Sequence, residues 1–512
     1  MGSRVSVLRK NVVYNLLGQS LVLLLTFAAV KFVYQDLGED LLGIIYFASL
    51  MSAITASVLD MGIAGTTVRE VAKYINKNNS YVTDLIKTAS TFYWVGYFFA
   101  ASILFILIPF IVENWISVTT TDISVVKDIV SILGVSGLLV LPRALYISLL
   151  RGCQKMGVIN VIDVMVVALQ QIGIVLILWV DGDAYNIAFW YTASYLLSVM
   201  VYMIVVGHTF GVSALVPGFS IDVVKKNMRF SANLMSISIT SMIHVQSDKV
   251  FISKFLPIGM MGFYSIVYAV ASKATMITVA ISQASYPRLS ELARNESHEE
   301  LNKLYFKLQD VVCILLPPIF ALIVFIERPG MELLFDKNVA EMLFIPTILL
   351  CLGFYMNDTV SMPYIYSLAV GKPNIVAKVN AYSLFVVIPA AYILISKYAL
   401  VGAALSWVFY HVVYYLLAMP KICRECMRIP VTGWYLYIAR ILLAIIGTYG
   451  VTWYVMEKYG LHSLGAILIL FVISTISYML LAYLLIGDEL KKSITHTLAD
   501  LRGRIFSKGS VC

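Results

Sequence analysis

Charged residues are scarce in this sequence. Asp, Glu, Lys and Arg make up only 13% of the 512 residues, whereas hydrophobic residues make up 60%. A soluble domain would carry about a quarter charged residues. Long apolar runs recur from one end of the chain to the other, and one bilayer crossing takes about 20 helical residues. The composition therefore excludes an ordinary soluble domain and indicates a membrane protein with many spans.

Motifs for metals, nucleotides and catalysis are also missing. The chain has six cysteines, and the C-R-E-C pair Cys423 and Cys426 lacks the second pair or nearby His that a zinc site needs. No Walker A sequence is present, so we do not expect ATP to drive the protein directly. The connections predicted to lie outside the membrane are short, which leaves little room for a catalytic domain. We therefore expect no metal, no cofactor and no enzyme activity.

The apolar runs predict an all-α polytopic membrane protein with about 14 transmembrane helices. The predicted spans are 11–34, 41–63, 83–112, 125–150, 158–180, 186–207, 229–256, 260–286, 305–327, 340–369, 375–396, 400–418, 433–456 and 463–487.

Positive charge is distributed unevenly between the loops. Of the 37 Lys and Arg residues, the predicted outer connections hold only Lys127, Lys254, Arg328, Lys337, Lys397 and Lys458. Cytoplasmic loops are the ones enriched in Lys and Arg. The pattern predicts a multi-pass protein of the cell membrane with both termini in the cytoplasm. It also explains the net charge of +8 without nucleic acid as a partner.

The chain contains a weak internal repeat. Gly43 in L-G-I-I-Y and Gly262 in M-G-F-Y-S are 219 residues apart, as are Gly152 and Gly371 in two further similar segments. Internal repeats are typical of transporters, with the substrate path at the repeat interface. We predict an N-terminal lobe over 1–210, a C-terminal lobe over 211–420, two appended helices over 421–487 and a cytoplasmic tail over 488–512.

Several ionisable residues fall inside the predicted spans, where such residues usually face a cavity or a partner. Three aspartates lie near predicted cytoplasmic helix ends and are expected to reach interfacial water, namely Asp60, Asp163 and Asp310. Lys31 lies near an outer helix end, where its side chain could extend to the interface. Arg143, Lys273, Asp358 and His411 lie deeper and are harder to explain as interfacial residues.

Polar residues form a stripe along one face of the span 229–256. The stripe comprises Asn233, Ser236, Thr240, Ser241, His244 and Asp248, and a shorter one on the first helix comprises Asn11, Asn15, Gln19 and Thr26. Hydrogen bonding between helices explains one such stripe, but two on equivalent helices favour a water-filled cavity. Asp248 is followed by Lys249, and the pair is either a fixed structural pair or part of an ion pathway.

Several motifs resemble one transporter family. They are N-V-V-Y-N-L-L-G-Q (11–19), D-L-G-E-D-L-L-G-I-I-Y (36–46), D-M-G-I-A-G-T-T-V-R-E-V-A (60–72), S-D-K-V-F-I-S-K (247–254), M-G-F-Y-S-I-V-Y (261–268) and Y-P-R-L-S-E-L (286–292). This series is similar to the Wzx-type oligosaccharide flippases of the MOP superfamily, which also holds the MATE drug antiporters and the lipid II flippase. The resemblance implies two six-helix lobes around a central cavity, plus two extra C-terminal helices.

The resemblance also implies a function. A flippase of this family would carry a polyprenyl-pyrophosphate-linked oligosaccharide from the cytoplasmic to the outer leaflet by alternating access, driven by an ion gradient or the membrane potential. Lys249 matches the family's Asp-Arg/Lys pair and is expected to meet the pyrophosphate. Depth and charge add three further cations to this substrate-binding group: Arg143, Lys273 and Lys31.

A second group of residues is predicted to serve ion coupling or to line the cavity as polar groups. It comprises Asp248, Asp358, His244, Asn15 and Gln19. The expected partners are the lipid-linked oligosaccharide, the bilayer, H⁺ or Na⁺ and glycan-biosynthesis proteins. Two alternatives stay open: a MATE-like cation or drug antiporter, and a membrane enzyme acting on lipid-linked glycans.

Overall fold

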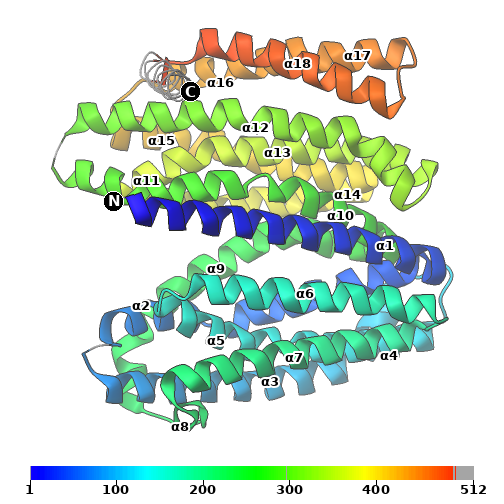
Figure 1. Cartoon of the computed structure of the whole chain (residues 1–512), viewed down its shortest axis with the longest axis vertical. Helices are drawn as coiled ribbons and strands as arrows, with labels where there is room; N and C mark the ends of the chain where they lie inside the picture. Colours follow the sequence, from blue (N-terminus) through cyan, green and yellow to red (C-terminus); the bar gives the residue numbers. More distant parts are fainter. Residues whose placement is uncertain (1, 76, 296, 488–489, 492–512) are drawn as a thin grey trace, which may run out of the picture. The chain divides into compact units, whose positions relative to one another are not determined.

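The computed structural model describes residues 2–75, 77–295, 297–487 and 490–491, without the side chains of 2–17, 19 and 20. Every regular element in this part of the chain is helical (Figure 1). The one isolated β-bridge joins Ser117 and Pro257. The predicted all-α fold class is therefore confirmed.

The chain divides into two compact units, residues 1–265 and 266–512. Helix α10 (Ile258–Lys273) crosses the boundary. The other helices of unit 1 are α1 (Gly2–Leu59), α2 (Ile63–Tyr74), α3 (Asn79–Trp115), α4 (Ile123–Gly137), α5 (Val140–Gly152), α6 (Met156–Trp179), α7 (Ala184–Phe210), α8 (Val212–Leu215) and α9 (Ile221–Phe255). The predicted division into lobes at 210/211 refers to the sequence repeat and stays a prediction.

Unit 2 contains the remaining helices. They are α11 (Met276–Arg294), α12 (His298–Leu334), α13 (Lys337–Ala369), α14 (Asn374–Leu417), α15 (Met419–Ile422), the π-helix η1 (Cys423–Met427), α16 (Val431–Ile445), the π-helix η2 (Ile446–Gly450), α17 (Val451–Lys458) and α18 (Leu464–Leu485).

Eleven helical segments of the described chain are long and apolar enough to cross a membrane. Two of these segments each cover two predicted spans and contain a kink, Leu21–Leu59 at Gly38 (φ 82°) and Asn374–Met427 at Ala399 (φ 49°). Glycine tolerates such a left-handed conformation, because it has no Cβ. Helix α9 is not among the eleven, since it is too polar. The count of about 14 spans is therefore not confirmed and stays a prediction.

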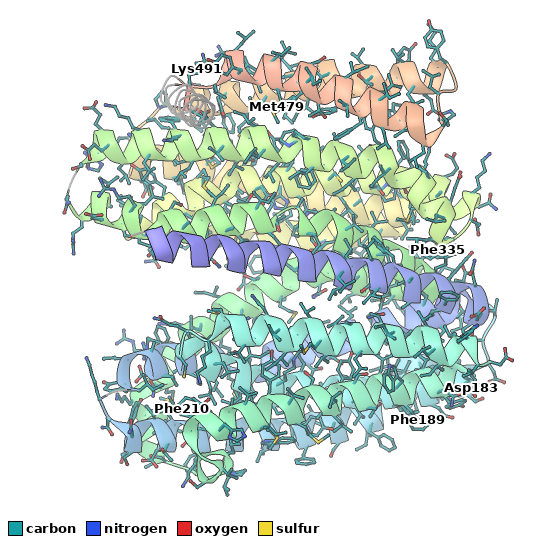
Figure 2. The ribbon with its side chains drawn as sticks, viewed as in Figure 1. Asp183, Phe189, Phe210, Phe335, Met479 and Lys491 are labelled. Carbon is teal, nitrogen blue, oxygen red and sulfur yellow. The ribbon has the colours of Figure 1, made fainter. Side chains whose placement is uncertain are left out.

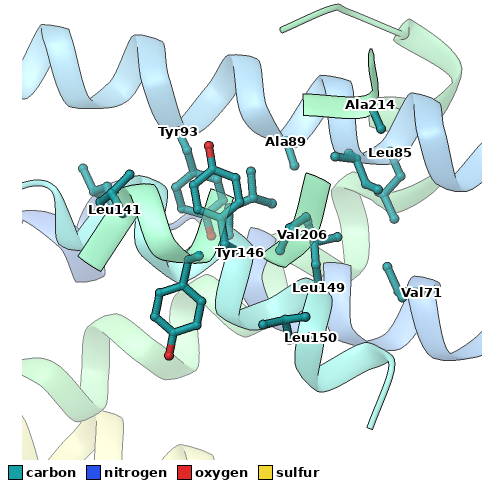
Figure 3. Packing of buried hydrophobic residues seen from close by; sticks show 14 of the residues in the cluster. Val71, Leu85, Ala89, Tyr93, Leu141, Tyr146, Leu149, Leu150, Val206 and Ala214 are labelled. Atoms are coloured by element: carbon teal, nitrogen blue, oxygen red, sulfur yellow. The ribbon is translucent and has the colours of Figure 1, made fainter. Parts of the chain in front are cut away.

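Large apolar side chains lie both in the interior and on the surface, as expected for a protein that is partly surrounded by lipid. The core of unit 1 contains Tyr93, Tyr146 and Leu149, which lie together between α3, α5 and α7 (Figure 3). Other apolar side chains point outward, such as Phe189 on α7, which is 59% exposed (Figure 2). A soluble protein rarely exposes large continuous apolar surface, so this exposure fits a membrane-facing helix.

Gly43 lies where α1 passes closest to α10. A Cβ atom on Gly43 would lie 2.0 Å from the backbone oxygen of Ile258, and one on Gly262 would lie 3.0 Å from the backbone nitrogen of Gly43. No side chain fits at the first position without moving a backbone. The two glycines that the sequence repeat aligns are thus in contact with each other inside unit 1.

Helices α16 and α18 are attached to α12 by hydrogen bonds within unit 2. Asp310 on α12 is buried and accepts hydrogen bonds from the Tyr437 hydroxyl (2.6 Å) and the Gly487 backbone nitrogen (3.0 Å). The Tyr478 hydroxyl donates to the Cys313 carbonyl oxygen (2.8 Å). The expectation that Asp310 simply reaches interfacial water is therefore wrong, because its carboxylate binds two partners inside the protein.

Candidate functional site

A cavity of about 340 Å³ lies inside unit 1, between α1, the start of α5 and α7. It forms where the fourth predicted span is interrupted: α4 ends at Gly137 and α5 begins at Val140. Serine hydroxyls line one side of the cavity, and Arg143 and Tyr195 complete its polar lining. Discontinuous membrane helices of this kind commonly border substrate sites in transporters.

Arg143 is held in this cavity by an acidic partner. Its Nη2 atom lies 2.5 Å from Oδ1 of Asp163, which also accepts a hydrogen bond from the Tyr202 hydroxyl at 2.6 Å. The Nε donor of Arg143 has no partner among the described residues. Asp163 was expected to reach interfacial water, but the structure pairs it with this cation. One side of the guanidinium is thus fixed, and other donors stay available for an anion.

Asp248 and Lys249 form a second, more buried pair in α9. Lys249 Nζ lies 3.4 Å from Asp248 Oδ1 and donates to the Val245 carbonyl oxygen at 3.0 Å. The other carboxylate oxygen of Asp248 accepts a hydrogen bond from the Tyr264 hydroxyl at 2.7 Å. This geometry favours the fixed structural pair over a freely accessible cation. Arg143 and Lys249 are therefore not brought to one site by these contacts, since each binds its own partners.

The polar stripe of α9 is partly exposed and partly buried. Asn233, Ser236 and Ser241, on the N-terminal side of the stripe, are exposed, whereas His244 and Asp248, at its C-terminal end, are buried. Helix α9 has 35 residues, more than enough to cross a bilayer. Exposed amide and hydroxyl groups at these positions are far more stable in water than in hydrocarbon. The exposed part of the stripe therefore indicates a wet face.

The other predicted substrate cations are placed as follows. Lys31 is half-buried on α1, and Lys273 is exposed at the end of α10, just before the break that separates α10 from α11. The side chains of Asn15 and Gln19 lie outside the described residues.

Unit 2 has a cavity of about 460 Å³ between α11 and α13, whose mostly apolar lining also carries hydroxyl and amide groups. Its lining includes Thr278, and Asp358 next to it is only 1% exposed. The Asp358 carboxyl faces Thr278 and Asn357, while its Oδ2 atom makes no hydrogen bond to the described residues. The Oδ1 atom of Asn357 also lies 3.4 Å from the Nε2 atom of His411. A buried carboxyl group with one oxygen that lacks a hydrogen-bond partner is suited to bind a proton or a small cation.

Sequence reasoning missed Glu70, a buried charge of unit 1 with several partners. Glu70 on α2 is buried, and its Oε1 atom lies 2.7 Å from Arg69 Nη2. Its Oε2 atom accepts a hydrogen bond from the Tyr81 hydroxyl (2.7 Å) and lies 3.7 Å from Lys226 Nζ. The carboxylate therefore joins α2, α3 and α9. The sequence signal was present, since α2 is a short amphipathic helix whose inward face carries this one acidic residue.

No cluster of three or more His, Cys, Asp or Glu side chains suited to a metal ion occurs in the part of the chain that the structure describes.

Comparison with known proteins relates both the sequence and the fold to transporters. Residues 8–293 match the family described as "Polysaccharide biosynthesis protein". The "Putative O-antigen transporter" of Shigella flexneri is 24% identical over 404 residues, which cover 78% of this chain and 93% of that protein.

Two solved structures show the same fold at low sequence identity. The lipid II flippase MurJ in an inward closed conformation has a TM-score of 0.68 at 12% identity, covering 92% of this chain and 98% of that one. An inward-facing multidrug resistance MATE family transporter of the MOP superfamily has a TM-score of 0.66 at 11% identity, covering 79% and 95%. At such identities the likeness shows the fold alone.

Proposed function

This chain belongs to the polysaccharide biosynthesis protein family, and on that premise we propose that it is a flippase for a lipid-linked oligosaccharide. The substrate is a polyprenyl-pyrophosphate-linked oligosaccharide, which moves from the cytoplasmic to the outer leaflet by alternating access. The Shigella relative, named as an O-antigen transporter and matched over most of both chains, supports this substrate class. The family resemblance seen in the sequence motifs is confirmed by the same match.

The observation that carries the proposal is the Arg143 cavity. It places a cation and several hydroxyl groups in a membrane-embedded unit, next to a helix break. A pyrophosphate needs cationic donors, and arginine binds phosphate groups through several N–H donors at once. Asp163 orients Arg143 without using all of these donors. The serine hydroxyls of the same cavity are suited to bind polar oxygens of the substrate.

The membrane potential favours outward movement of this substrate. Each elementary charge that crosses 100 mV changes the free energy by about 2.3 kcal/mol. With a negative cell interior, an anionic pyrophosphate gains free energy on the way out. Arg143 is paired with Asp163, so this pair adds no net charge to the empty cavity, and the membrane potential does not oppose the return of the empty site through it.

Ion coupling is the second part of the proposal. Asp358 is the preferred carrier of H⁺ or Na⁺, because its buried Oδ2 atom has no hydrogen-bond partner among the described residues and a cavity lies beside Thr278, which it faces. Asp248 is less suitable, because Lys249 and Tyr264 already bind its two oxygens. We further propose that the protein lies in the cell membrane with both termini in the cytoplasm and works alongside glycan-biosynthesis proteins.

The experiment that tests the function is export of lipid-linked oligosaccharide in a cell lacking its own flippase. Wild type should restore surface glycan, Arg143→Gln should lose most of this export, and Arg143→Lys should retain part of it. Asp163→Asn is the variant to compare with Arg143→Gln, because it removes the negative charge beside Arg143 while keeping the cation. Lys249→Ala tests whether the α9 pair is also needed. Equal export by Arg143→Gln and wild type, at equal protein levels, would refute the role of the cavity.

A MATE-like antiporter is the alternative, and the buried Asp358 is the observation that favours it. A drug-resistance assay in a pump-deficient host separates the two functions. Resistance conferred by wild type and lost in Asp358→Asn, together with no glycan export across several glycan systems, would replace the flippase proposal.

A further inference from the structure

A second cavity of unit 1, about 260 Å³ in volume, lies between α2, α3 and the inner end of α9. We propose that this inner cavity binds the phosphate end and the adjoining isoprene units of a polyprenyl phosphate lipid. The inference builds on the proposed function, because it assigns the place where the lipid part of the substrate docks. It concerns a different set of residues from the Arg143 cavity.

The lining of the inner cavity is mostly apolar and adaptable. It includes Phe92 on α3 and three methionines, Met61, Met228 and Met235. Methionine side chains are flexible and fill irregular apolar spaces. Such a lining offers few partners to a sugar, but it suits a branched, flexible hydrocarbon chain. The volume admits one chain more readily than the two acyl chains of an ordinary phospholipid.

Cations lie on the same stretch of α9, next to the residues that line the cavity. Lys225 and Arg229 are exposed and form no ion pair with the described residues. Lys226 and Arg69 both contact Glu70, and Arg69 Nη2 also donates to Oδ1 of Asn227 (3.2 Å), which lines the cavity. The surroundings of the cavity are therefore basic, with two cations that are not paired with a carboxylate of the described residues.

The order of these residues along α9 matches the shape of a lipid phosphate. The lining runs from Val223 to Met235, about 18 Å along the helix at 1.5 Å per residue. Lys225 falls near the end of this stretch that is predicted to face the cytoplasm, and Arg229 lies about one turn further along, halfway through it. A phosphate bound there would leave its hydrocarbon chain directed along the apolar part of the cavity.

A buried hydroxyl supports a ligand in this position. Thr67 on α2 lines the cavity, its side chain is fully buried, and its Oγ1 atom has no hydrogen-bond partner among the described residues. Buried polar groups normally have a partner. A phosphate oxygen of the lipid would supply the missing acceptor.

The test is direct binding of a radiolabelled long-chain polyprenyl monophosphate to the purified full-length protein in detergent. Removing the two unpaired cations of α9 in Lys225→Gln/Arg229→Gln should weaken binding on the order of tenfold. Met235→Trp, which fills part of the cavity, should weaken it as well. The matched controls should bind like wild type: Arg294→Gln/Lys378→Gln removes two exposed cations of unit 2, and Met242→Trp adds the same bulk to α9 outside the cavity lining.

Two results would overturn the inference. One is equal affinity for wild type and both cavity variants, each shown to be folded by its chromatographic profile. The other is displacement of the probe by phosphatidylglycerol as effectively as by unlabelled polyprenyl phosphate, which would make the cavity a general phospholipid site. Failure of the flippase proposal gives a different pattern, in which the wild type binds the lipid with this specificity but exports no glycan.

Discussion

Replacing Glu70 with alanine should destabilise unit 1. Glu70 is only 3% exposed, and its carboxylate binds Arg69 at 2.7 Å and the Tyr81 hydroxyl at 2.7 Å. Removal of Glu70 takes away the acceptor of the Tyr81 hydroxyl and of Arg69, and the loss of a hydrogen bond to a charged group is costly. The variant also removes the carboxylate contacts that join α2 to α3 and α9.

The magnitude follows from the three partners. Hydrogen bonds to charged groups contribute about 1.5–3 kcal/mol each, and the Tyr81 hydroxyl supplies one of them. The side chains of Arg69 and Lys226 are 42% and 44% exposed, so solvent limits the contribution of each ion pair to about 0–1 kcal/mol. Glu70→Ala should therefore lower the free energy of unfolding by about 2–4 kcal/mol. Glu70→Gln should cost about 1–2 kcal/mol, because the amide oxygen still accepts one of these bonds.

The assay is thermal unfolding of the purified protein in detergent, followed by the fraction that stays monodisperse. For domains of 150–250 residues the expected loss corresponds to a decrease in Tm on the order of 10 °C. Glu113→Ala is the control, since Glu113 contacts Lys127 at 2.5 Å but is 53% exposed, and such surface pairs contribute little. If Glu70→Ala and Glu113→Ala melt at the same temperature, the reasoning from burial is refuted.

Three further predictions concern packing and water access. Gly43→Ala should cost at least about 1–3 kcal/mol from overpacking, because its Cβ would lie 2.0 Å from a backbone oxygen of α10; an unchanged Tm would contradict the close approach. Ser236→Cys on the wet face of α9 should react with a water-soluble maleimide, whereas the buried Ser247→Cys should not, and equal labelling would argue against a polar path along α9. Tyr437→Phe removes one hydrogen bond to Asp310 and should cost about 0.5–3 kcal/mol, measured as a lower Tm; no change would mean that Gly487 alone satisfies this carboxylate.

Part of the candidate site could be predicted from the sequence. Arg143, Asp358 and the stripe of α9 were identified from charge, depth and periodicity, and the structure places cavities beside the first two. Lys249 was predicted as a substrate cation from the family resemblance, but the structure engages it with Asp248 and a backbone carbonyl. Depth in a membrane indicates that a charge needs a partner without indicating which partner it has.

The sequence by itself determined the class of this protein. Apolar runs of membrane-spanning length set the all-α architecture, because only helices and closed barrels satisfy the backbone in hydrocarbon. The order of loosely matched motifs identified the family. Both properties depend on local composition and local spacing, which can be read along the chain.

Only the tertiary structure decided how the ionisable residues pair. Arg69 and Asn227 lie 158 positions apart and are joined by a hydrogen bond, while Arg143 finds Asp163 on the neighbouring helix α6. Such contacts depend on which helix faces meet and at what register. Helical periodicity gives the face of each residue but not the neighbour of that face. For that reason the sequence indicated where charges needed compensation, and the packing of the helices supplied it.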